Sequence, residues 1–146
     1  MIKEQLLQDL KTAMREKDVL RRDMLQIARA AYLQTEKDSQ TELDDAGVIA
    51  LIAKEVKKRE ELLADLKTSD RQDIIDRTKA EIAIFEAYLP EQMDAAQVEE
   101  VVRKAIAATG ATAARDMGMV MKAVIPEIAG RADNKLVNQV VRRLLA

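Results

Sequence analysis

The sequence contains no histidine, cysteine or tryptophan, and its only aromatic side chains are Tyr32, Phe85 and Tyr88. Histidine and cysteine supply most of the acid–base groups, thiol nucleophiles and transition-metal ligands of proteins. Their absence excludes a zinc site, an iron–sulfur cluster, a Ser-His-Asp triad and disulfide bonds. No other pattern marks an enzyme, so we expect no catalytic residue, no cofactor and no bound metal.

Long apolar runs are also missing. No run approaches the roughly 18–20 residues that are needed to cross a bilayer. The first residues mix charged and apolar side chains, where a signal peptide would be apolar. We therefore expect a cytoplasmic protein with no membrane segment.

The overall charge is nearly balanced, with 24 basic and 26 acidic residues. Such a balance gives no general attraction to nucleic acids or anionic membranes. The distribution is less even, because residues 115–146 contain six basic side chains and three acidic ones. The C-terminal end is therefore mildly basic.

Apolar residues recur at steps of three and four along every long segment, and no stretch alternates with period two over more than a few residues. This spacing predicts an all-α fold. Residues 1–90 should form a bundle of about four helices. We expect one helix over Ile2–Arg15, a second capped by Asp18, a third after the acidic segment 41–47, and a fourth that ends at Pro90.

A domain boundary is expected at Pro90, and residues 91–146 should form a small second domain of three short helices. Helix starts favour side chains that accept backbone hydrogen bonds, and helix ends favour glycine and proline. The expected caps at helix starts are Asp94 with Gln97, Thr112 and Asp133, and the expected helix ends are Gly110, Pro126 and Gly130.

Arg59 is the one charged member of the apolar stripe of the third predicted helix. Its aliphatic stem could lie along the bundle while the guanidinium reaches solvent or pairs with a carboxylate, such as Glu55 one turn earlier. Alternatively, Arg59 contacts a ligand or a partner protein in a groove.

Gly118 falls inside a predicted helix, where glycine costs on the order of 1 kcal/mol relative to alanine. Gly110, Gly118 and Gly130 lack the close spacing of a phosphate-binding loop. Gly118 therefore indicates close approach, either of another helix or of a ligand.

Five cations surround the last two predicted helices: Lys122, Arg131, Lys135, Arg142 and Arg143. Scattered cations usually form a solvated face. The alternative is contact with phosphates, in which counterion release would favour binding of a nucleic acid. Because the second domain has no aromatic residue, such binding would depend on phosphates and shape and not on stacking of bases.

Several short motifs along the whole chain are similar to those of the YqeY family, whose members are related to the C-terminal tail of the GatB subunit of tRNA-dependent amidotransferases. The motifs are Lys17-Asp18, Glu55-Val56-Lys57-Lys58-Arg59, Tyr88-Leu89-Pro90 with Gln92, Gly110-Ala111-Thr112, Asp116-Met117-Gly118, Val120-Met121-Lys122 and Gly130-Arg131-Ala132-Asp133. The chain departs from the family pattern at Gln26, where a basic residue is usual, and at Asn134, where a glycine is usual.

This resemblance implies a helical module that contacts tRNA, since the amidotransferase tail engages the outer corner of tRNA and the amide-transfer chemistry lies in a separate catalytic domain. The resemblance therefore implies a non-catalytic protein that binds tRNA or another structured RNA. The five cations described above, Lys122, Arg131, Lys135, Arg142 and Arg143, are the expected contacts. A label of carbon–nitrogen ligase activity with glutamine as amido donor would be transferred to this chain only from the related amidotransferase. The alternative is a protein-interaction adaptor that does not bind nucleic acid, with Gly118 and Arg59 as candidate contacts.

Overall fold

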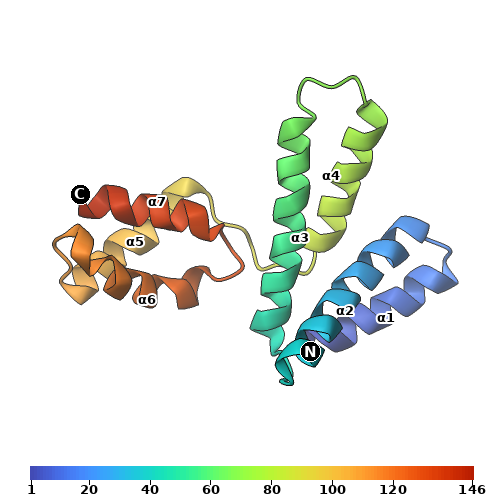
Figure 1. Cartoon of the computed structure of the whole chain (residues 1–146), viewed down its shortest axis with the longest axis horizontal. Helices are drawn as coiled ribbons and strands as arrows, with labels where there is room; N and C mark the ends of the chain where they lie inside the picture. The colour runs from blue at the N-terminus through green and yellow to red at the C-terminus, as the bar shows by residue number, and fades with distance from the viewer. The chain divides into compact units, whose positions relative to one another are not determined.

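The computed structural model describes residues 1–146 and contains seven α-helices, one short 3₁₀ turn and no strand. The predicted all-α fold is confirmed. The chain divides into two compact units, Met1–Leu89 and Pro90–Ala146, each with its own apolar core (Figure 1). None of the helices is both long and apolar enough to cross a membrane.

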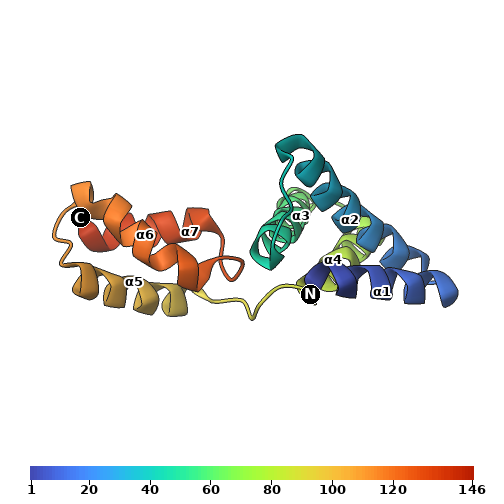
Figure 2. The same ribbon diagram turned by 90° about the horizontal axis from the view of Figure 1, so that it is seen from below.

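The first unit consists of two helical hairpins. These are α1 (Ile2–Arg15) with α2 (Val19–Ser39), and α3 (Asp45–Asp65) with α4 (Gln72–Glu86) (Figure 2). Helix α2 also packs against α3 and α4, and this contact closes the core. The largest fully buried side chains of the unit are Leu6, Leu25, Ile52, Val48 and Phe85.

Local sequence signals set the helix starts of this unit. The side chain of Asp18 accepts a hydrogen bond from the backbone N–H of Arg21 at 3.2 Å, so the predicted Asp18 cap is confirmed. Asp44 caps α3 in the same way by accepting from the N–H of Gly47 at 2.8 Å. Each contact satisfies one of the backbone donors that the first turn of a helix leaves free.

The second unit is a bundle of α5 (Ala95–Thr109), α6 (Met117–Ile128) and α7 (Asn134–Leu145), in which each helix packs on the other two. Valine is the commonest residue of its core, with Val98, Val102, Val120, Val124 and Val141 fully buried. Because each helix turns its apolar face inward, the three outward faces point in different directions.

Three predicted ends in this unit are confirmed. Asp94 and Gln97 form a reciprocal capping box at the start of α5. Gly110 ends α5 in the left-handed conformation with φ +73°, which favours a residue without Cβ. Asp133 caps α7 by accepting from the N–H of Lys135 at 3.1 Å.

The predicted start of α6 was wrong, because Thr112 is not its cap. Residues 114–116 form a 3₁₀ turn, and α6 begins only at Met117. The carboxylate of Asp116 accepts the backbone N–H groups of Thr112 and Ala113, at 3.0 and 3.2 Å. These hydrogen bonds hold the pKa of Asp116 below its usual range, with the bond from Thr112 as the main cause.

Pro126 does not end α6, contrary to the prediction. The helix continues to Ile128, and the N–H of Ala129 still donates to the carbonyl of Ile125 at 2.9 Å. The proline ring fits the helical φ, but it removes the hydrogen bond to the Lys122 carbonyl and crowds that carbonyl, and the helix ends two residues later. The chain turns instead at Gly130, where φ is +76°.

Candidate functional site

The outer face of α7 carries three exposed cations, Lys135, Arg142 and Arg143. Arg142 and Arg143 follow Lys135 by seven and eight residues, so Arg142 lies about 20° from Lys135 around the helix and all three side chains fall within an arc of about 100°. Val137 and Val141 on the opposite side are buried in the core. α7 itself contains no acidic residue, so every charged side chain of this helix is a cation.

One of these cations is already paired. Nη2 of Arg143 donates to Oε2 of Glu99 on α5 at 2.9 Å, and Arg103 donates to Oε1 of the same carboxylate at 2.6 Å. The hydrogen bond from Arg103, and then the one from Arg143, keep the pKa of Glu99 below its usual range. Lys135 and Arg142 form no ion pair, so they are the cations of α7 most available to an anionic ligand.

Arg131 lies in the loop before α7, and its side chain is directed toward the unit's own backbone. Its Nε donates to the carbonyl of Glu91 at 3.0 Å, and its own carbonyl accepts from the N–H of Met93 at 2.8 Å. The side chain of Gln92 donates to the carbonyl of Gly130 at 2.8 Å. These contacts join the α6–α7 loop to the segment that precedes α5, so Arg131 holds the bundle together in addition to carrying charge.

Lys122 does not belong to the basic face of α7. It lies on the exposed face of α6, where the residues one turn away are Gly118, Met119, Ile125 and Pro126. Met119 and Ile125 are each 46% exposed, and none of these neighbours is acidic. Lys122 is therefore an unpaired cation in the middle of an apolar helix face.

Gly118 is the second residue of α6 and is exposed. A Cβ added at this position would meet no atom within 4 Å, so packing against another helix does not require glycine here. Close packing of another helix therefore does not explain Gly118, and the other alternative, approach by a ligand or a partner, stays a prediction.

Arg59 in the first unit is bound by its own neighbours. Its guanidinium bonds to Oε2 of Glu81 at 2.9 Å and to Oε2 of Glu55 at 3.2 Å, and it lies 4.8 Å from the centre of the Phe85 ring. The side chain is only 15% exposed. These contacts correspond to the alternative in which Arg59 pairs with a carboxylate, and they leave little of the guanidinium for a ligand.

The two ion pairs of Glu99, with Arg103 and with Arg143, were not predicted from the sequence. The Glu99–Arg103 pair has the i,i+4 spacing that a sequence reveals, but the contact between Glu99 and Arg143 joins residues 44 positions apart. No local sequence pattern signals such a pair.

No group of three or more acidic side chains lies close enough together to hold a metal ion.

Comparison with known proteins places the chain in a family. A family model described as "Yqey-like protein" matches residues 3–145. A relative from Pyrenophora tritici-repentis (strain Pt-1C-BFP), named "Altered inheritance of mitochondria protein 41, mitochondrial", is 24% identical over 140 residues, which span 94% of this chain and 77% of the relative. That name assigns the relative to mitochondria, so the cytoplasmic location expected from the sequence stays a prediction.

Proposed function

The chain belongs to the YqeY-like family, and from this premise we propose that its C-terminal unit binds folded RNA, with tRNA as the expected class, and performs no catalysis. The observation that carries the proposal is the acid-free outer face of α7, on which Lys135 and Arg142 form no ion pair. No amide-transfer step is proposed, because the resemblance involves the tail of the amidotransferase and not its catalytic domain.

The interface would recognise phosphates and shape. Each phosphate that a lysine or arginine neutralises releases counterions, so affinity falls with salt by roughly 0.7–0.9 log units per contact for each tenfold rise in salt. With Lys135 and Arg142 available and Arg143 shared with Glu99, we expect a slope of about −1.5 to −2.5. Arg131 would contribute mainly by holding the loop before α7 in place.

The test is fluorescence anisotropy with bulk tRNA across a salt series. The double variant Lys135→Gln/Arg142→Gln should weaken binding about tenfold at low salt and flatten the slope by about two. The matched control Lys104→Gln/Arg115→Gln removes the same charge from exposed positions of the unit outside α7 and should have a much smaller effect. No binding by the unaltered protein at low salt would contradict the proposal.

A second candidate function is protein binding by the exposed face of α6. The observation that favours it is the pair of exposed apolar side chains Met119 and Ile125 on either side of Lys122. Large apolar side chains that gather on one exposed face are typical of protein interfaces. A pull-down that survives nuclease treatment but is lost in Met119→Ser/Ile125→Ser would favour this candidate over RNA binding.

A further inference from the structure

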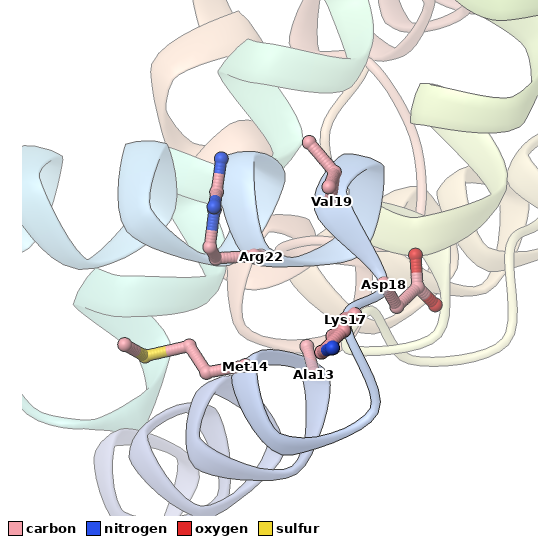
Figure 3. Close-up of a pocket in the computed structure, with 6 residues that line it drawn as sticks. All are labelled: Ala13, Met14, Lys17, Asp18, Val19 and Arg22. Atoms are coloured by element: carbon pink, nitrogen blue, oxygen red, sulfur yellow. The ribbon is translucent and has the colours of Figure 1, made fainter.

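A hollow of about 270 Å³ lies at the turn between α1 and α2, in the unit that the proposed RNA interface does not use. Figure 3 shows the six side chains that line it: Ala13, Met14, Lys17, Asp18, Val19 and Arg22. Two of them, Lys17 and Asp18, form one of the motifs that the sequence shares with its family. This motif has no role in RNA binding by α7.

The backbone of this turn holds Lys17 in an unusual conformation. The N–H of Lys17 donates to the carbonyl of Met14 at 3.3 Å, and the N–H of Asp18 donates to the carbonyl of Ala13 at 2.9 Å. This pair of hydrogen bonds is the Schellman arrangement, in which the left-handed position is usually glycine. Lys17 occupies that position with φ +58°, which is unfavourable for a residue with a Cβ. Strained residues of this kind concentrate at functional sites.

The walls of the hollow leave apolar surface uncovered. Met14 and Val19 are 55% and 54% exposed, and they are among the most exposed large apolar side chains of the chain. They face the hollow from the last turn of α1 and the first turn of α2. A second hollow of about 330 Å³ adjoins Val19 on the side of Leu20, Asp23 and Arg77, so the apolar surface continues beyond Val19.

The charges of the hollow favour an anion. Arg22 is bound by both Nε and Nη2 to Asp23, at 3.0 and 2.8 Å. The carboxylate of Asp18 caps α2, and in Figure 3 it points away from Met14 and Arg22. Neither Lys17 nor Asp18 forms an ion pair, and because the Asp18 carboxylate is directed away, Lys17 is the unpaired cation of the lining.

We propose that this hollow binds a small amphiphilic anion, whose apolar body contacts Met14 and Val19 and whose anionic group pairs with Lys17. The volume lies just below the roughly 300–1,000 Å³ that is typical of small-molecule sites, so it fits a short-chain carboxylate and excludes a dinucleotide. Lysine in place of glycine at the turn carries the cation to the edge of the apolar wall, which accounts for the strained conformation.

The test is an NMR titration of the full chain with octanoate, and with octanol as a neutral probe of the same chain length. Octanoate should shift the amide signals of residues 13–22 in a saturable manner and bind about 1.5- to fivefold more tightly than octanol, because one exposed ion pair is worth about 0.2–1 kcal/mol. Shifts that do not saturate, or that lie elsewhere, would overturn the proposal.

Two variants separate binding from folding. Lys17→Gly keeps the turn and relieves its strain, so the melting temperature should rise while the affinity for octanoate falls to that for octanol. Met14→Gln should weaken both probes, whereas Met119→Gln, at a similarly exposed methionine of the other unit, should weaken neither. Unchanged octanoate affinity in Lys17→Gly would contradict a role for the cation.

Discussion

Nη2 of Arg143 on α7 lies 2.9 Å from Oε2 of Glu99 on α5, and this contact joins the proposed RNA-binding face to an acidic side chain. The same carboxylate also binds Arg103. A phosphate that approached Arg143 would therefore compete with Glu99, and the negative charge of Glu99 would also oppose the approach. The Glu99 carboxylate should limit the affinity of the face for RNA.

Replacing Glu99 should therefore strengthen RNA binding. In Glu99→Gln, Arg143 becomes available and one negative charge is lost, so we expect affinity for bulk tRNA to rise severalfold at low salt and the salt slope to steepen by about one. The control Glu100→Gln removes the same charge from the next residue of α5, which pairs with Lys104. Equal effects of the two variants would show that only net charge matters.

Loss of Arg59 should destabilise the first unit without affecting RNA binding. Arg59→Ala leaves the carboxylates of Glu55 and Glu81 without their shared cation in a largely buried site, and we expect a loss of about 2 kcal/mol in the free energy of unfolding, measured with urea. Arg77→Ala is the control, since Arg77 also binds Glu81 but is 65% exposed, and it should cost less than about 0.5 kcal/mol.

Substitution of two glycines should change stability in opposite directions. Gly118 has open space around its Cβ position and no positive φ, so Gly118→Ala should stabilise the second unit by about 0.4–1 kcal/mol through the entropy of the unfolded chain. Gly110→Ala places a Cβ in a left-handed residue and should destabilise the unit by about 1 kcal/mol or more. Urea denaturation measures the free energy of unfolding of both variants. A loss of stability in Gly118→Ala would contradict the open space at the Cβ position of Gly118.

Much of the fold could be predicted because the signals are local. Asp18, Asp94 and Asp133 each cap a helix through a donor two or three residues ahead, which a sequence displays directly. The start of α6 could not be predicted in this way. There, Asp116 accepts from backbone groups that precede it, and the segment forms a 3₁₀ turn first.

The candidate site was predictable in composition but not in arrangement. The sequence identifies the cations, and helical spacing places Lys135 and Arg142 on one face. It does not show that Arg131 turns to the carbonyl of Glu91, 40 residues earlier, or that Glu99 neutralises Arg143 from another helix. Such contacts depend on how the helices pack, for which no short-range pattern exists.

The hydroxyl of Tyr88, just after α4, donates a hydrogen bond to Oδ2 of Asp9 on α1. Burial is the main cause that raises the pKa of Tyr88 above its usual value, and this hydrogen bond is the second. Because the pKa is higher in the folded state, the stabilisation is complete below about pH 10, the unfolded value, and is lost as the pH rises above it. Tyr88→Phe should therefore cost about 1–2 kcal/mol in the free energy of unfolding at pH 8, and the difference from the unaltered protein should shrink at pH 11. In an Asp9→Ala background the same substitution should cost much less, since the partner is already gone. Urea denaturation at the two pH values measures both effects, and a difference that is equal at pH 8 and pH 11 would contradict the raised pKa.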